Sequence, residues 1–297
     1  MTKKAFLERI AAGEVLVSDG ATGTNLQQKG LPVGAAAELW VLQNPHAIRA
    51  LNLAFIQSGS DILLTCTFSA TRRRLKAMGL EAHFEEINCT AVEISRKAAS
   101  AHEVLVAGSI GPLGELLEPL GEMTVEEAEA NFREQAELLC RGGVDLIVVE
   151  TQFDLNEARA ALRAVRTVDP AIPLVCSFSY DRGVRTMMGV KPEDMAAEIG
   201  AMDVDLLGIN CGRSLEDNLE VLTRLRTATE KPLWFKPNAG LPEVDQDGKA
   251  IYAVTPSEMS VLVPSWVTAG AQVIGGCCGT SPEHLAAIAL EIHALDH

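Results

Sequence analysis

The stretch Gly275-Gly276-Cys277-Cys278-Gly279-Thr280-Ser281-Pro282 places two adjacent cysteines between a strand-like run and a helix start. The run before it, residues 271–274, is short and apolar, and serine followed by proline is typical of the first residues of a helix. Far upstream, residues 205–209 form a similar run that ends in Asn210-Cys211-Gly212. We therefore expect Cys211, Cys277 and Cys278 to converge on one metal ion.

Short apolar runs alternate with longer helical patterns along the whole chain. The runs are nearly continuous in apolar residues, which indicates strands buried on both faces of a parallel sheet. Eight of them, each followed by a helical pattern, predict a single (β/α)8 TIM barrel, with residues 1–297 as one domain. A doubly wound open sheet is the alternative, because a sequence does not reveal closure. The predicted strands are residues 15–18, 61–65, 104–107, 145–149, 173–178, 205–209, 232–235 and 271–274.

Helix starts carry recognisable signals in four places. The pairs Thr124 and Glu127, Asp154 and Glu157, and Thr255 and Glu258 have the spacing of a capping box. Asn44 before Pro45 predicts an N-cap followed by proline at the first helical position.

Composition excludes several classes of protein. The formal net charge of −15 argues against nucleic acid or an anionic membrane as the main partner. No run is long and apolar enough to span a bilayer, and Glu8 and Arg9 interrupt the apolar core that a signal peptide needs. We therefore expect a cytoplasmic protein, in which the seven cysteines are thiols or ligands rather than disulfides.

In a barrel, the residues that follow the strands share the C-terminal face, where such enzymes place their sites. Strands six and eight are one apart around the barrel, so at ~4.8 Å per strand their ends lie roughly 10 Å apart. Short loops could close that gap around zinc, which forms Zn–S bonds of ~2.3 Å. Two alternatives for Cys277 and Cys278 are a pair of small buried residues and a vicinal disulfide. The polar set on this face is Asp19-Gly20, Cys66-Thr67, Ser109, Glu150-Thr151, Asn210-Cys211, Lys236-Pro237-Asn238 and Cys277-Cys278.

Three motifs resemble the signatures of the zinc-dependent homocysteine S-methyltransferase family. They are Asp19-Gly-Ala-Thr-Gly-Thr24, Gly208-Ile-Asn-Cys-Gly212 and Gly275-Gly-Cys-Cys-Gly279, and the likeness runs from about residue 15 to about residue 292. The resemblance implies the barrel fold, and it implies that Cys211, Cys277 and Cys278 bind Zn²⁺. Three thiolates would leave a fourth tetrahedral position open for the homocysteine sulfur. Homocysteine would then be activated as a zinc-bound thiolate and methylated to methionine.

The amino acid's charged ends need partners as well. Asp19 and Glu150 suit the ammonium group, and the resemblance supports both; the alternatives are a turn residue for Asp19 and a surface ion pair for Glu150. Backbone N–H groups of Gly20, Ala21 and Thr22 could hold the carboxylate, because a turn with glycine exposes donors. The same kinship adds Thr67, Ser109 and Asn210 to the expected substrate pocket and suggests Asn238 as a displaceable fourth zinc ligand.

Further stretches resemble the homocysteine-binding module of cobalamin-dependent methionine synthase. They are Thr65-Cys-Thr-Phe68, Ser109-Ile-Gly-Pro112 and Pro237-Asn-Ala-Gly-Leu-Pro242, although that branch usually has asparagine where Cys66 stands. No stretch of these 297 residues resembles the folate barrel or the corrinoid module of the full synthase, and no Asp-x-His corrinoid-ligand pattern occurs in them. We therefore expect a methylcorrinoid donor carried on a separate protein. The alternative is a small donor such as S-methylmethionine or betaine, although the C-terminal extension typical of betaine-using relatives is missing.

Two different classes of protein compete with this interpretation. Lys236 at the end of the seventh strand is compatible with a Schiff-base aldolase on the same fold. A non-catalytic zinc- or thiol-binding subunit is the other possibility, with Cys66 and Cys176 as spare ligands if they are not core residues. The six histidines show no metal-ligand spacing, and we assign them no role.

Overall fold

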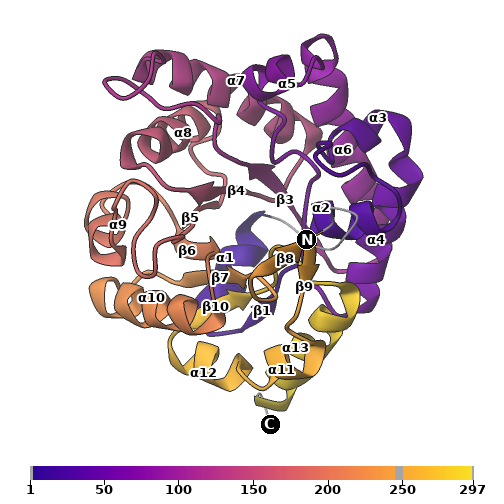
Figure 1. Ribbon diagram of the computed structural model, residues 1–297, viewed down its shortest axis with the longest axis vertical. Helices are drawn as coiled ribbons and strands as arrows, with labels where there is room; N and C mark the ends of the chain where they lie inside the picture. The colour runs from indigo at the N-terminus through magenta and orange to yellow at the C-terminus, as the bar shows by residue number, and fades with distance from the viewer. Residues whose placement is uncertain (1–2, 245–249, 296–297) are drawn as a thin grey trace.

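The predicted apolar runs form one eight-stranded parallel sheet, in the order β1-β10-β7-β6-β5-β4-β3-β2. A parallel bridge between Ser18 and Ile62 joins β1 to β2, so the sheet closes into a barrel. Helices surround the strands in the computed structural model, which describes residues 3–244 and 250–295 (Figure 1). The (β/α)8 barrel is thereby confirmed over the open sheet. The strands are β1 (Leu16–Val17), β2 (Ile62–Leu64), β3 (Leu105–Ile110), β4 (Leu146–Gln152), β5 (Leu174–Phe178), β6 (Leu206–Cys211), β7 (Leu233–Pro237) and β10 (Ala271–Ile274).

The helices begin mostly where the sequence signals predict. Thr124 and Thr255 form the predicted capping boxes with Glu127 and Glu258. None of the helices in residues 3–244 and 250–295 combines the length and apolarity needed to cross a membrane. The helices are α1 (Lys3–Ala11), α2 (Thr22–Gln28), α3 (Leu39–Gln43), α4 (Pro45–Gln57), α5 (Arg72–Ala77), α6 (Phe84–Ala99), α7 (Val125–Gly142), α8 (Leu155–Val168), α9 (Pro192–Glu198), α10 (Leu215–Ala228), α11 (Pro256–Ser260), α12 (Val263–Thr268) and α13 (Pro282–Leu295).

Two of the predicted caps differ from expectation. Asp154 accepts hydrogen bonds from two backbone N–H groups of α8, but the Glu157 carboxylate turns away and accepts the Leu113 N–H at 2.6 Å. The second hydrogen bond of a capping box, from the Asp154 N–H to the Glu157 carboxylate, is therefore absent, because that carboxylate binds a buried N–H of the β3–α7 loop. Asn44 occupies the N-cap position of α4 without a capping hydrogen bond from its side chain.

Alternate strand residues divide the core into two layers. The inward layer fills the barrel with side chains such as Leu146, Val148 and Trp234. The intervening residues, such as Ile147 and Val149, pack outward against the helices. Both layers are apolar because the strands of a barrel are covered on both faces.

Several short elements escape the sequence prediction, among them α1, α2, α3 and a hairpin after β7. Helix α1 contributes Phe6 and Ile10 to the inward layer, so it covers one end of the barrel. An antiparallel hairpin, β8 (Pro242–Val244) with β9 (Ala250–Tyr252), follows β7 where we expected only a loop. In Figure 1 the two hairpin strands are drawn near the centre of the helical ring.

An aspartate stands before each of three alternate strands and binds the backbone of the neighbouring strand. Asp61, Asp145 and Asp205 precede β2, β4 and β6, and their carboxylates accept backbone N–H groups of the preceding strand in the barrel at 2.9, 2.8 and 2.8 Å. Each carboxylate also pairs with an arginine, at 2.9, 2.7 and 3.0 Å respectively. Charge-assisted hydrogen bonds of this kind are stronger than neutral ones. The three aspartates therefore brace the strands at the end where the chain enters the barrel.

Replacing Asp145 by alanine should lower the free energy of unfolding by about 2 kcal/mol, the usual range for hydrogen bonds to charged groups being roughly 1.5–3 kcal/mol. The loss arises because the buried Val106 N–H and the Arg96 guanidinium both lose their acceptor. Urea unfolding measures the change. The matched control is Glu93→Ala, which removes an exposed ion pair with Lys97 and should cost less than about 1 kcal/mol. Equal effects of the two substitutions would contradict the bracing role.

Candidate metal centre

The three cysteines expected to share a metal lie together at the C-terminal mouth of the barrel. Cys211 is the last residue of β6, and Cys277 and Cys278 follow β10. The Cys211 and Cys277 sulfur atoms are 2.8 Å apart, and all three sulfurs lie within 4.8 Å of one another. Only β7 separates β6 from β10, so the predicted convergence of the sixth and eighth strands is what the structure has.

Backbone contacts aim the cysteine pair at β7. The Cys277 N–H donates to the Pro237 carbonyl at 2.8 Å, and the Ala239 N–H donates to the Cys278 carbonyl at 2.9 Å. Gly275 is required here because a Cβ at this position would lie 2.8 Å from the Asp19 carbonyl oxygen. The close approach of β1 to β10 thus explains a glycine of the motif.

The donor set fits a thiophilic cation. Zn–S bonds of ~2.3 Å in a tetrahedral site imply sulfur–sulfur distances of about 3.8 Å. The three sulfurs lie within 4.8 Å of one another, and Cys211 and Cys277, at 2.8 Å, would have to move apart around an ion. Hydrogen bonds from the Cys211 and Cys277 thiols lower the pKa of Cys278, whereas the pKa values of Cys211 and Cys277 are raised, so the cluster favours one thiolate. The Asn238 side chain donates to the Gly212 carbonyl at 3.0 Å, while its oxygen is buried and has no hydrogen-bond partner among the described residues. The three sulfurs could together hold one ion, and Asn238 adjoins them through its backbone N–H, which donates to the Cys211 carbonyl at 3.3 Å.

The spare cysteines stand apart from this cluster. Cys66 and Cys176 are buried, and neither belongs to the group of sulfurs that could share an ion. Burial raises the pKa of both thiols, which keeps them protonated at neutral pH. Both are core residues, as the simpler interpretation of the sequence has it.

Beside the sulfurs, the inward strand positions change from apolar to charged. Following the inward alternation, Val148 is succeeded by Glu150 and Trp234 by Lys236. The Glu150 carboxylate accepts the Ser109 hydroxyl, its only hydrogen-bond partner among the described residues, at 2.5 Å. Burial raises the pKa of Glu150 to about 7, although the nearby Lys236 ammonium acts in the opposite direction. The mouth thus carries an incompletely paired carboxylate.

Asp19 is more fully engaged than the sequence suggests. Its carboxylate accepts the Lys236 ammonium at 2.6 Å and the Leu64 N–H at 2.8 Å, and the residue is 1% exposed. In the adjoining turn, the Ala21 N–H already donates to the Thr280 hydroxyl at 3.1 Å. Of the acidic pair expected to meet an ammonium group, Glu150 therefore has the freer oxygen.

Lys236 is poorly suited to Schiff-base chemistry. Burial alone would lower its pKa, but the Asp19 and Glu150 carboxylates outweigh burial and raise it. A lysine nucleophile must lose its proton, and the salt bridge to Asp19 opposes that loss.

The remaining predicted pocket residues form hydrogen bonds within the protein or are buried. The Thr67 hydroxyl donates to the Ser109 carbonyl at 2.7 Å, and Asn210 is completely buried.

Sequence reasoning missed two residues of the mouth. They are Ser177, an inward residue of β5 whose hydroxyl donates to Asn210 at 2.7 Å, and Tyr252 on β9. A Cβ on Gly279 would lie 2.2 Å from the Tyr252 ring, so this aromatic ring covers the end of the cysteine motif. Inward alternation along β5 could have indicated Ser177, whereas the short β9 carries no signal for Tyr252.

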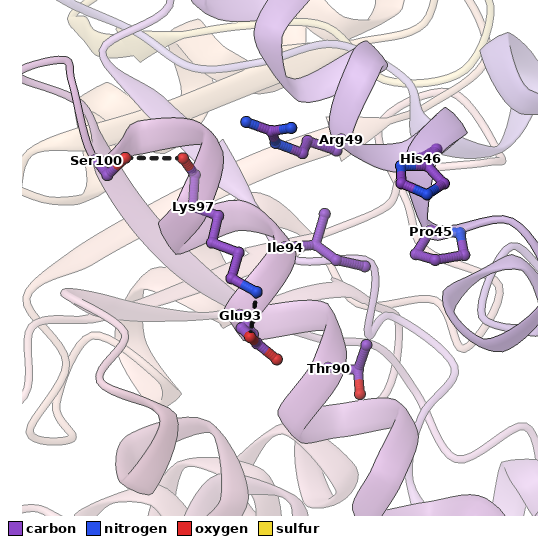
Figure 2. A pocket seen from close by; sticks show the side chains of 8 residues that line it. All are labelled: Pro45, His46, Arg49, Thr90, Glu93, Ile94, Lys97 and Ser100. Carbon is purple, nitrogen blue, oxygen red and sulfur yellow. Dashed lines mark hydrogen bonds and ion pairs between the residues drawn. The ribbon is translucent and has the colours of Figure 1, made fainter.

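An open groove of about 540 Å³ lies elsewhere, on the outside of the barrel between α4 and α6. Figure 2 shows His46 and Arg49 on one side of the groove and Lys97 on the other, with the Lys97 side chain directed at Glu93 of its own helix. No cysteine lines this groove, so it is separate from the candidate metal centre.

Comparison with known proteins agrees with the geometry of the mouth. The model of a family described as homocysteine S-methyltransferase matches residues 16–292. The chain is 32% identical to the homocysteine S-methyltransferase of Escherichia coli (strain K12) over 297 aligned residues, which cover 93% of this chain and 94% of the relative. The metallated crystal form of the homocysteine methyltransferase MmuM from Escherichia coli matches with a TM-score of 0.81 and 29% identity, covering 96% of this chain and 98% of that one. Its oxidized form matches with a TM-score of 0.77 and the same identity, covering 93% and 95% of the two chains. The chain therefore belongs to the homocysteine S-methyltransferase family and is an enzyme of methyl transfer to a thiol.

Proposed function

We propose that this enzyme methylates homocysteine to methionine at a Zn²⁺ ion held by Cys211, Cys277 and Cys278, within one domain spanning residues 1–297. The observation that carries the proposal is the set of three sulfurs within 4.8 Å at the mouth of the barrel. Zinc bound there would take the homocysteine sulfur as a thiolate, which is the form that attacks a methyl group. The three cysteine thiolates offset the positive charge of the ion, so the substrate sulfur keeps its nucleophilicity. Asn238, with its unpaired buried oxygen, is suited to leave when the substrate arrives.

Glu150 is our candidate partner for the substrate ammonium. It has one hydroxyl partner and lies near the fixed positive charge of Lys236. With Asp19 and Glu150 ionised and Lys236 protonated, this side of the mouth has one excess negative charge, which a bound ammonium would neutralise. The backbone N–H groups of Gly20 and Thr22 are our candidates for binding the substrate carboxylate, because the Ala21 N–H already donates to Thr280.

For the methyl donor, we propose a methylcorrinoid carried on a separate protein. The motif likeness to the cobalamin-dependent branch favours it, and so does the hairpin that follows β7. Leu241 and Ile251 there are 51% and 52% exposed, an apolar edge suited to a macromolecular donor. A small sulfonium or ammonium donor is the second candidate, because Tyr252 beside the cysteine motif offers an aromatic face of the kind that binds such cations.

A panel of donors distinguishes these candidates. Zinc-loaded enzyme and homocysteine should yield methionine fastest with a methylated corrinoid protein and measurably with methylcobalamin. S-methylmethionine, betaine and methyltetrahydrofolate are the comparison donors, and methionine formed per minute is the readout. Turnover with betaine or S-methylmethionine alone would reject the corrinoid proposal and retain homocysteine as acceptor.

Cys277→Ala should abolish stoichiometric zinc binding and reduce turnover to background, because two thiolates cannot complete the site. Zinc is measured by atomic absorption after gel filtration, and methionine by chromatography. Cys89→Ala is the matched control, since this partly buried thiol on α6 lies outside the sulfur cluster. Full zinc content and normal turnover in Cys277→Ala would contradict the ligand assignment.

The KM for homocysteine should rise as the pH falls below about 7, because the pKa of Glu150 is raised to about 7 and its carboxyl is protonated, hence neutral, below that value. Each further pH unit removes about nine-tenths of the ionised form, so KM should increase up to about tenfold per unit. Glu150→Gln should raise KM and remove this steepening below about pH 7, leaving only the dependence that comes from release of the thiol proton on zinc binding. The matched control is Glu157→Gln: burial also raises the pKa of Glu157 to about 7, but its carboxylate binds the Leu113 N–H instead. A pH profile that Glu150→Gln leaves unchanged would refute the role of Glu150.

A further inference from the structure

Asn210 uses its complete hydrogen-bonding capacity inside the protein. A side-chain amide offers two acceptor positions on oxygen and two N–H donors. The Asn210 oxygen accepts the Thr151 N–H at 2.9 Å and the Ser177 hydroxyl at 2.7 Å. The nitrogen donates to the Thr151 hydroxyl at 2.7 Å and faces the sulfurs of Cys211 at 3.4 Å and Cys277 at 3.9 Å. Nothing of the side-chain amide is therefore left for a ligand in this arrangement.

The residues that Asn210 holds are the strained ones. Among the described residues, Thr151 with φ +59° and Cys211 with φ +60° are the only non-glycine residues in the left-handed region. Such a backbone conformation is a genuine outlier for a β-branched residue, and it persists only when its surroundings impose it. Asn210 clamps Thr151 through both its N–H and its hydroxyl, and it directly precedes Cys211 in the chain. One buried amide therefore holds the first outlier directly and faces the sulfur of the second at 3.4 Å.

Thr151 and Cys211 each belong to a different part of the proposed substrate site. Thr151 directly follows Glu150, the candidate partner of the ammonium group, and Cys211 is one of the three sulfur ligands. We propose that Asn210 is a positioning residue that fixes Glu150 relative to the metal and donates its second N–H to the sulfur ligands. This inference rests on the proposed function. An N–H bonded to a ligating sulfur withdraws electron density from it, as outer partners of metal ligands generally tune their metals.

The two halves of this role are separable by substitution. Asn210→Asp retains an oxygen that can accept from Thr151 and Ser177. It replaces the NH2 group that faces the sulfurs by a second oxygen, which cannot donate a hydrogen bond. In cobalt-substituted enzyme, the sulfur-to-cobalt charge-transfer band should move to longer wavelength, because sulfur that lacks its N–H donor releases an electron more easily. Asn210→Ala should shift this band and also raise the KM for homocysteine about tenfold or more, because the Thr151 clamp is lost.

Thr151→Gly supplies a rescue, since glycine adopts φ near +60° without a clamp. The double variant Asn210→Ala with Thr151→Gly should recover most of the KM while the shifted band remains. The matched control is Asn218→Ala. Asn218 is another buried asparagine beside the same ligand, but it donates to the Cys211 carbonyl at 2.8 Å rather than to a sulfur. It should leave the position of the band unchanged.

These measurements separate failure of the inference from failure of the proposed function. A thiolate–cobalt band in the unsubstituted enzyme tests whether cysteines hold the metal at all. If that band is present but Asn210→Asp does not shift it, or if Asn218→Ala shifts it equally, the sulfur half of the inference is overturned. If glycine at position 151 restores no homocysteine affinity to Asn210→Ala, the positioning half is overturned.

Discussion

The parallel register of β6, β7 and β10 is the constraint on which the mouth of this barrel depends. Pro237 at the end of β7 is the register partner of Cys211 on one side, and its carbonyl accepts the Cys277 N–H on the other. One residue of the intervening strand therefore sets the separation of sulfurs that are 66 residues apart in the chain. A slip of one residue in either pairing would displace one sulfur relative to the other by about 3.3 Å along the strands.

The sequence is most informative where one local rule decides the outcome. Nearly continuous apolar runs indicate strands buried on both faces, and all eight predicted strands are present. Glycines around Cys277 and Cys278 indicate close backbone approach, which the contact of Gly275 with β1 explains. The paired cysteines could be assigned to one cluster because the strand order of a barrel follows from the sequence order of its strands.

Features set by tertiary contacts could not be predicted in the same way. Asp19 and Lys236 are far apart in the chain, and their salt bridge depends on which faces of β1 and β7 turn inward at the mouth. The Glu157 carboxylate does not complete the predicted capping box, because it accepts a hydrogen bond from a buried N–H of another loop. The strands of the β8–β9 hairpin are three residues each, too short for a period to show, and Tyr252 therefore remained unnoticed.

The stabilising aspartates before β2, β4 and β6 and the residues of the candidate site lie at opposite ends of the barrel. The aspartates lie where the strands begin, whereas the sulfurs, Glu150 and the hairpin lie where the strands finish. Rigidity and reactivity therefore draw on separate sets of residues. Evolution could lengthen or exchange the loops around the mouth to suit another methyl source without dismantling the scaffold beneath them.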